Sequence, residues 1–341
     1  MTPAQLRKLP KIELHCHLDG CVRVQTVAEI GRELGIVLPA PLRDALVAPE
    51  QCENLLDYIS RIDLAIQVMQ RPQDLARIAR ELIEYMAADG VIYAEVRFAP
   101  QLHTRRGMSL QEVVDVVSSG LRSAAAKHGI GVGLIICCLR HESAEQSLTI
   151  ARLATANMDK VNGLDLAGDE GAFPDAEPHR QAFLAAREAG LHRTVHAGEN
   201  AGPSSVRQAL DRLGAERIGH GVRAEEDPAL VSRVAETFVP LEMCPRSNVQ
   251  TRATDSLAAH PIDRFLRCGV PVTVSTDCRT VSATTLTGEF ELLKKQFGWG
   301  LREFTQCQEI AARSIFAPKR TKENLLERIG AALRDLRPEP A

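Results

Sequence analysis

The 341-residue sequence lacks a long hydrophobic stretch and lacks an excess of positive charge. Its longest apolar stretch, residues 132–139, is far shorter than the roughly 20 residues that cross a bilayer, so we expect no membrane span. The formal net charge is −3 and no Lys/Arg cluster occurs, whereas a protein that binds nucleic acid needs a basic face. We therefore expect neither a membrane nor a nucleic acid as a partner.

The nine cysteines lack the spacing of a disulfide framework and include no CxxC pair. Because their number is odd, and because Cys137 and Cys138 lie inside an apolar stretch, we expect reduced thiols packed in the core. Residues 1–10 also lack the apolar centre of a signal peptide. Both features predict a cytoplasmic location.

Several common catalytic motifs are absent as well. The chain has no GxGxxG fingerprint, no Walker loop and no GxSxG elbow. What is present is the composition of a globular protein, with 45% hydrophobic and 25% charged residues. The length is compatible with one large α/β domain.

One pattern repeats along the chain, in which an amphipathic helical stretch ends in glycine and a short apolar stretch follows. Between Leu75 and Met86, for example, apolar residues have helical spacing, and Gly90 comes just before the next apolar stretch. Glycine suits such positions because it adopts a left-handed backbone without steric penalty. We predict strands at residues 11–17, 91–98, 131–139, 161–167, 192–197, 217–220, 239–243 and 270–276.

Eight apolar strands that alternate with helices predict a parallel sheet in an α/β fold, either a closed barrel or a doubly wound open sheet. Periodicity alone does not separate the two. Candidate site residues, however, follow or close the predicted strands. They are His15, His17, Gly168, Asp169, His196, Glu199, His220 and Asp277. Only a closed barrel brings the ends of the first, fifth, sixth and eighth strands around one axis, so we predict a (β/α)₈ TIM barrel.

The segment at residues 18–90 is too long for a simple connection between the first two strands. It carries helical patterns at residues 24–34, 55–69 and 75–86. We interpret residues 20–88, approximately, as a helical insertion that forms part of the pocket wall, and residues 301–337, approximately, as C-terminal helices on the outside of the barrel. Without an internal repeat or a low-complexity linker, residues 1–341 are predicted to be a single domain.

The sequence His15-Cys16-His17 places two imidazoles on one face of a strand, because alternate residues of a strand point the same way. Alone, this motif is weak evidence for a metal site and favours two hydrogen-bonded core or rim histidines. With His196 and Asp277 the set becomes three imidazoles and one carboxylate, which suits a zinc-type ion with one position open for water. Such an ion lowers the pKa of its water from ~15.7 toward ~7.

Glu199 and His220 are the candidate acid and base. Partial burial raises the pKa of a carboxyl group, so Glu199 could hold a proton to donate, although a surface glutamate at a helix start has the same spacing. His220, between two glycines, could bind and deprotonate the metal water, or it could be a core histidine. The end of the fourth predicted strand, residues 164–169, has no lysine to bridge two metals, which favours one metal ion.

In these and neighbouring residues the chain resembles the adenosine deaminase family. The shared motifs are HCHLDG at residues 15–20, LDLAGDE at 164–170, RTVHAGE at 193–199, RIGHG at 217–221, MCP at 243–245 and STD at 275–277. They occur in order over nearly the whole chain. The resemblance implies a barrel with one catalytic Zn²⁺ per subunit and a hydrolase that acts on cyclic amidines in purine metabolism.

The resemblance also implies a role for each matching residue. Zn²⁺ would be held by His15, His17, His196 and Asp277. Glu199 would protonate the ring nitrogen beside the attacked carbon, and His220 would orient and deprotonate the metal water. Gly168 would offer its backbone amide to the purine, and Asp19 would meet the ribose hydroxyl end.

The chain departs from the family directly after the metal-binding aspartate. Most members have a second Asp there, commonly followed by Pro, whereas this chain has Cys278 and Arg279. The second Asp bonds the five-membered part of the purine, and a thiol is a weak donor and acceptor, so this bond is weaker or absent here. Tyr58 and Ile62 fall where members often place Phe over the sugar.

These departures leave the substrate open. Adenosine is the first expectation, and free adenine or a modified adenine nucleoside are alternatives. Two hypotheses belong to other functional classes: a metal-dependent amide or ester hydrolase, and a non-catalytic binding protein on the same scaffold. Arg279 would pair either with an acidic group of a modified nucleoside or, as we expect, with a glutamate such as Glu289. The expected partner is a small-molecule purine nucleoside, and the subunit number is left open, a homo-oligomer included.

Overall fold

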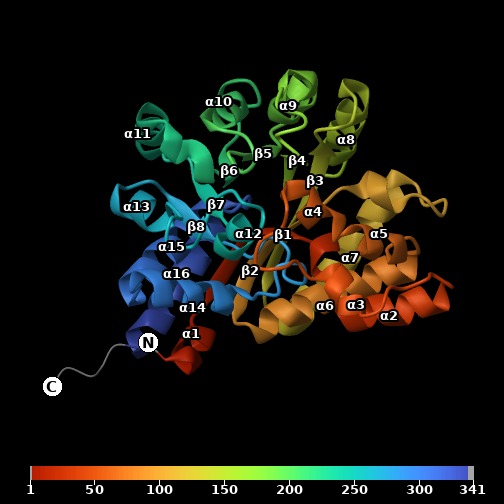
Figure 1. Ribbon diagram of the computed structural model, residues 1–341, viewed down its shortest axis with the longest axis horizontal. Coiled ribbons are helices and arrows are strands. Elements are labelled where there is room, and N and C mark those ends of the chain that lie inside the picture. Colours follow the sequence, from red (N-terminus) through yellow and green to blue (C-terminus); the bar gives the residue numbers. More distant parts are fainter. Residues whose placement is uncertain (1, 337–341) are drawn as a thin grey trace.

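The computed structural model describes residues 2–336, and its centre is a parallel sheet of eight strands in sequence order (Figure 1). Each strand pairs in parallel with the next one along the chain. The strands are β1 (Lys11–His17), β2 (Val91–Phe98), β3 (Gly131–Leu139), β4 (Gly163–Ala167), β5 (His192–Ala197), β6 (Arg217–His220), β7 (Leu241–Met243) and β8 (Val272–Val274). Their order is that of a (β/α)₈ barrel.

Backbone hydrogen bonds join β1 to the segment that follows β8. The His17 N–H donates to the Asp277 carbonyl at 2.8 Å, and the Asp277 N–H donates to the His15 carbonyl at 2.9 Å. Cys16 and Asp277 form a parallel bridge at the same place. The seam closes the barrel, so the predicted TIM barrel is confirmed and the open sheet is wrong.

Helices surround the strands on the outside of the barrel (Figure 1). They are α1 (Pro3–Lys8), α2 (Val24–Glu33), α3 (Leu42–Leu46), α4 (Leu55–Ser60), α5 (Asp63–Val68), α6 (Pro72–Ala88), α7 (Leu110–His128), α8 (Ala144–Ala156), α9 (Arg180–Glu188), α10 (Pro203–Asp211), α11 (Pro228–Glu236), α12 (Pro245–Gln250), α13 (Ile262–Arg267), α14 (Leu286–Phe297), α15 (Leu301–Ser314) and α16 (Lys319–Leu336). Within residues 2–336, none of the helices combines the length and apolar character that a membrane crossing requires.

Helix α7 illustrates how local sequence sets the boundaries. The Ser109 hydroxyl accepts a hydrogen bond from the backbone N–H of Glu112, whose carboxylate bonds back to the N–H of Ser109. This capping box satisfies two backbone donors that have no partner inside the helix. The helix ends at Gly129, whose φ of 66° is left-handed.

The predicted strands at residues 161–167, 239–243 and 270–276 extend beyond the observed β4, β7 and β8. The predicted helix at 55–69 is two helices, α4 and α5, separated at Arg61 and Ile62. That stretch contains no Pro or Gly, so no local signal marks the break. The helices α2 to α5 precede the barrel helix α6, and α4 and α5 contribute Tyr58 and Ile66 to the pocket wall.

The interior of the barrel holds a fully buried network of charges instead of an apolar filling. Arg97 contacts Asp165 at 2.9 Å and Glu242 at 2.7 Å. Arg217 contacts Glu95 and Glu242, each at 2.6 Å. Charges without water are tolerated only when each one is paired, and this network pairs them all.

We expect Gly120→Ala to destabilise the protein although alanine is the better helix former. A Cβ at Gly120 would lie 2.9 Å from the Ala79 Cβ and 3.0 Å from the Ala76 carbonyl oxygen, where α7 packs on α6. Such overpacking costs about 1–3 kcal/mol, which exceeds the gain of about 0.5–1 kcal/mol in helix propensity. Denaturant unfolding should show a net loss of about 1–2 kcal/mol.

The matched control is Gly330→Ala in α16, where the nearest atom to an added Cβ is Arg334 Nη1 at 3.8 Å. With no overlap, the propensity gain remains, and we expect stabilisation by about 0.5–1 kcal/mol. Equal effects of the two substitutions would contradict the packing argument.

Candidate functional site

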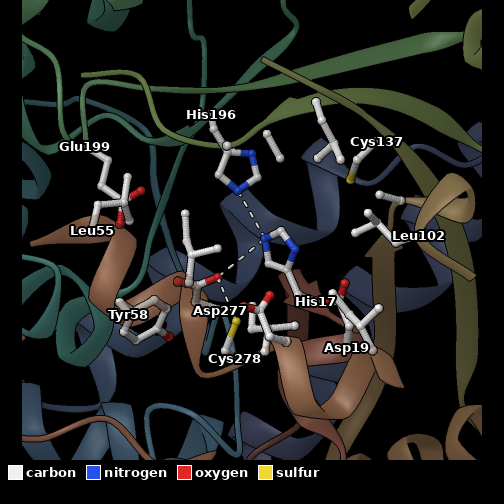
Figure 2. A pocket seen from close by; sticks show the side chains of 18 of the residues that line it. His17, Asp19, Leu55, Tyr58, Leu102, Cys137, His196, Glu199, Asp277 and Cys278 are labelled. Carbon is white, nitrogen blue, oxygen red and sulfur yellow. Dashed lines mark hydrogen bonds and ion pairs between the residues drawn. The ribbon is translucent and has the colours of Figure 1, made fainter. Parts of the chain in front are cut away.

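The predicted site residues meet at the C-terminal ends of the strands (Figure 2). His15 and His17 come from β1, His196 from β5 and His220 from β6. The ring centroids of His15 lie 4.5 Å from His196 and 4.6 Å from His220. Side chains that are up to 205 positions apart in the sequence therefore share one cavity.

Four side chains direct their donor atoms to one point. His17 Nε2 lies 3.1 Å from His196 Nε2 and 3.5 Å from Asp277 Oδ1. His15 Nε2 lies 3.6 Å from the same carboxylate oxygen. The three imidazoles can hold one metal ion together, and Asp277 faces the same point.

Hydrogen bonds on the far side of two rings fix which nitrogen faces this point. His15 Nδ1 lies 2.9 Å from Glu242 Oε2, and His196 Nδ1 lies 3.0 Å from Asp165 Oδ2. A carboxylate only accepts, so each Nδ1 carries the proton and each Nε2 presents a lone pair.

The lone pair of His15 Nε2 is buried and has no hydrogen-bond partner among the described residues. Burial, and next the charge of Arg97, hold the pKa of His15 well below its usual range, so the ring is neutral. A buried, unpartnered lone pair that converges with other ligand atoms fits a divalent metal ion.

The backbone at two site residues is left-handed although neither is glycine. Asp277 has a φ of 58° and His220 a φ of 64°. Such conformations are costly for ordinary residues and persist where the surroundings impose them. At Asp277 the seam with β1 fixes the backbone, and the Ser247 hydroxyl donates to Oδ2 at 2.6 Å. These contacts hold the other oxygen, Oδ1, toward the histidines.

Glu199 lies in the turn after β5, and a second glutamate holds that turn. The carboxylate of Glu170 accepts from the backbone N–H groups of Gly198 and Glu199, each at 2.9 Å. Burial, and next the nearby carboxylates Asp277 and Glu170, raise the pKa of Glu199 well above its usual range. Glu199 is therefore protonated more readily than an exposed glutamate, and its Oε1 has no partner among the described residues.

His220 lies on the other side of Glu199. Its Nε2 is 3.4 Å from Glu199 Oε2, and its Nδ1 is 2.9 Å from the side-chain nitrogen of Asn248. Burial lowers the pKa of His220 to about 3, so the ring is neutral.

The pocket above these residues encloses a space of about 740 Å³, including its open mouth, which is in the usual range for a small-molecule site. Glu199 and Asp19 lie on opposite sides of His17 and His196 (Figure 2). The other predicted substrate residues, Gly168 and Cys278, line the same space. Burial raises the pKa of Asp19 to about 6.

Tyr58 and Ile62 line the apolar side of the pocket, together with Leu55, Ile59 and Ile66. The Tyr58 hydroxyl lies 2.6 Å from the Ser282 hydroxyl, which holds the ring in the wall. The helices after β1 therefore supply an apolar cover over the polar floor.

Arg279 does not reach this pocket. It is fully buried, with Nη2 3.0 Å from Asp89 Oδ2 and its guanidinium 4.7 Å from the centre of the Tyr85 ring. Both expectations for this residue are therefore wrong, the acidic group of a substrate and Glu289 alike. Glu289 instead accepts from Thr284 and from the backbone of Arg246.

Several supporting residues were not singled out from the sequence. They are Asp165, Glu170, Glu242, Ser247 and Asn248. Two of them lie inside the motif at residues 164–170, which is the only local signal that could have indicated them. The others act through contacts that form only when the barrel closes.

Comparison with known proteins was made over the whole chain. The family model described as adenosine deaminase matches residues 10–332. An adenosine deaminase of Clostridium acetobutylicum is 36% identical over 329 residues, which cover 95% of this chain and 98% of the relative. The alignment with this relative therefore covers nearly the whole of this chain, including the barrel and the site.

Two solved structures are similar in fold and sequence. The adenine deaminase of Arthrobacter aurescens has a TM-score of 0.89 and 31% identity, covering 96% of this chain and 99% of its own. An amidohydrolase from Burkholderia ambifaria with bound Zn has a TM-score of 0.88 and 27% identity, covering 98% and 94%.

We expect His17→Ala to remove most of the metal affinity without unfolding the protein. The substitution deletes one of the converging nitrogens, and the side chain lies at the pocket rather than in the charge network. Loss of an outer partner of a ligand typically costs about 10–100-fold in affinity, so loss of a ligand should cost more. Competition with a chelator, followed by elemental analysis, measures the change.

His192→Ala is the control, because His192 pairs with Glu216 outside the site. It should bind the metal as the unaltered protein does. Unchanged metal content in His17→Ala would refute the ligand assignment of His17.

Proposed function

The chain belongs to the adenosine deaminase family, and we propose that it hydrolyses the exocyclic amine of adenosine or a closely related adenine nucleoside, releasing ammonia and the inosine-type product. It is a hydrolase that acts on cyclic amidines. The observation that carries the assignment of roles is a buried Glu199 with a raised pKa, across one pocket from a cluster of side chains that could hold a metal ion.

The chemistry of the purine explains why this pairing suits deamination. An aromatic ring resists attack by water, and protonation of the ring nitrogen beside the reacting carbon removes that resistance. Glu199 can donate this proton because burial raises its pKa and so favours the protonated form. After attack, collapse of the tetrahedral carbon expels the amine as ammonia. An ester or amide needs no such donor to a ring nitrogen, so this arrangement favours an aminopurine.

We assign the metal site to His15, His17, His196 and Asp277, with zinc as the metal. Three imidazoles and one carboxylate are a donor set that zinc accepts. A divalent cation there supplies a nucleophile near neutral pH by acidifying water. His220 and Glu199 face the same space from the side, and His220 orients the attacking water.

The pocket favours a neutral nucleoside over a nucleotide. Among the described residues that line it, none is Lys or Arg, and Asp19 and Asp63 are acidic. A phosphate group would therefore enter without a cationic partner and near like charge. Asp19, opposite Glu199 (Figure 2), can accept from a ribose hydroxyl when the purine ring lies at Glu199, and the amide of Gly168 can meet the ring. This arrangement favours adenosine over free adenine.

The nine cysteines are free thiols, and eight of them are buried. Thiols in this state agree with a reducing compartment, and we therefore assign the enzyme to the cytoplasm.

The direct test is a substrate screen, read as ammonia release, over adenosine, deoxyadenosine, adenine, AMP and a chromogenic ester. We expect adenosine and deoxyadenosine to be the best substrates and the ester to be inert. Glu199→Gln cannot donate the proton, so kcat should fall by about 10²–10⁴-fold while metal content stays unchanged. Glu177→Gln, at an exposed position, is the control.

Ester hydrolysis without amine release would overturn the assignment. Full turnover by Glu199→Gln would show that the proton comes from another group.

A second prediction concerns the thiol at the position where the family usually has aspartate. Cys278 is buried in the pocket, with Sγ 3.6 Å from Asp277 Oδ1. In Cys278→Asp, burial beside Asp277 favours the protonated acid, which donates to the five-membered part of the purine. One added hydrogen bond is worth about 0.5–1.5 kcal/mol, so KM for adenosine should fall by about 2–10-fold.

Cys278→Ala removes the thiol without adding a donor and should leave KM nearly unchanged. If Cys278→Asp does not lower KM more than Cys278→Ala does, Cys278 is not at the ring-binding position.

A further inference from the structure

A chain of hydrogen bonds runs from the outer face of His220 to two backbone amides. The first of these is the N–H of Ile262, which donates to His260 Nδ1 at 3.2 Å. Because a backbone N–H can only donate, Nδ1 of His260 is an unprotonated acceptor. His260 is fully buried and burial lowers its pKa to about 3, so the neutral ring carries its single proton on Nε2.

The next member of the chain is Asn248, which is also fully buried. Its side-chain oxygen accepts from His260 Nε2 and from the backbone N–H of Cys244, each at 3.1 Å. These two donors determine which end of the amide is oxygen. The amide nitrogen must therefore face His220 Nδ1, at 2.9 Å.

An amide nitrogen donates and does not accept, so Nδ1 of His220 is a lone pair. An imidazole whose Nδ1 is a lone pair carries its single proton on Nε2, the nitrogen that faces Glu199 Oε2 and the reaction space. This polarity is opposite to that of His15 and His196, whose Nδ1 atoms face carboxylates and whose Nε2 atoms present lone pairs.

We propose that Asn248, held by His260 and the Cys244 amide, is a positioning residue that fixes the Nε2–H form of His220, so that His220 meets the attacking water as a hydrogen-bond donor. A water acidified by a divalent cation at the proposed metal site would lose its proton to bulk solvent before it attacks the ring, and not to His220. The proposal rests on the proposed function for the reaction that His220 serves. It replaces the general-base role that the family resemblance implies for His220.

The hydrogen-bond partner on the outer nitrogen of each ring alone decides whether that histidine can bind the metal ion or contacts the reacting water. Rings with a lone pair at the centre can bind a cation, whereas a ring with an N–H there repels one and attracts the lone pairs of an oxygen. His220 lies 4.6 Å from His15 between ring centroids, so without this control it would be a fourth competing imidazole ligand.

The test is Asn248→Asp in the metal-loaded enzyme. The new carboxylate has the shape of the amide and can accept from His260 and Cys244 as before. Toward His220, however, it accepts where the amide donated, which moves the His220 proton to Nδ1 and leaves Nε2 as a lone pair. If His220 acts as a base, this carboxylate should strengthen it. If His220 acts as a hydrogen-bond donor, the substitution removes the N–H that it donates to the water.

Two measurements distinguish a hydrogen-bond donor from a general base at His220. In ¹⁵N-histidine spectra, with the His220 signal identified by its loss in His220→Gln, we expect Nε2–H in the unaltered enzyme and Nδ1–H in Asn248→Asp. We also expect kcat of Asn248→Asp to fall by about tenfold or more, with KM within about twofold, because the lost contact is made to the reacting oxygen.

Asn157→Asp is the matched control, since Asn157 is buried and bonded to Gln111 outside the site. It should leave the His220 signal and kcat unchanged, and thermal unfolding of both variants shows that each is folded. Nδ1–H in the unaltered enzyme, or kcat maintained or raised in Asn248→Asp, would overturn the proposal. Failure of the unaltered enzyme to release ammonia from any adenine compound would overturn the proposed function instead, because the spectra report the proton position without turnover.

Discussion

Glu242 and Asp165 have no access to water, and each accepts hydrogen bonds from one imidazole of the site and from Arg97. The proposed metal site depends on this arrangement, because the carboxylates fix the two rings with their lone pairs toward the centre. Burial raises the pKa of Asp165, but the electrostatic attraction of His196 and Arg97 outweighs it and holds that pKa below its usual value. Removing any member would leave an unpaired buried charge, and such losses are strongly destabilising. The floor of the site and the core of the barrel are therefore the same set of side chains, so folding and chemistry share one constraint.

Much of the fold follows from the sequence because each β/α unit carries its own local signals. The bounds of β1, β2, β3, β5 and β6 are those that the apolar stretches predict. The break between α4 and α5 could not be predicted, because no Gly or Pro marks it in the sequence. The candidate site divides in the same way. His15, His17, His196 and Asp277 lie at strand ends, where period and topology together bring them to one rim.

The hydrogen-bond partners of those residues could not be predicted in this way, because they depend on distances across the closed barrel. No local pattern relates Glu242 to His15, which is 227 positions away, or Asn248 to His220. Arg279 shows that a residue next to a pocket residue in the sequence is equally hard to place. It follows Cys278 directly, yet its side chain lies against Asp89 and Tyr85, away from the cavity. Proximity in the sequence to a pocket residue says nothing about which way a side chain points. Whether a histidine can act as a metal ligand or as a hydrogen-bond donor is likewise decided by atoms outside the sequence motif that contains it.

The seam between β1 and Asp277 has a consequence for the synthesis of the protein. Two of the proposed metal ligands, His15 and His17, are made at least 260 positions before Asp277, which both faces them and closes the barrel. The complete set of proposed ligands can therefore form only after the segment that follows β8 has been made and has paired with β1.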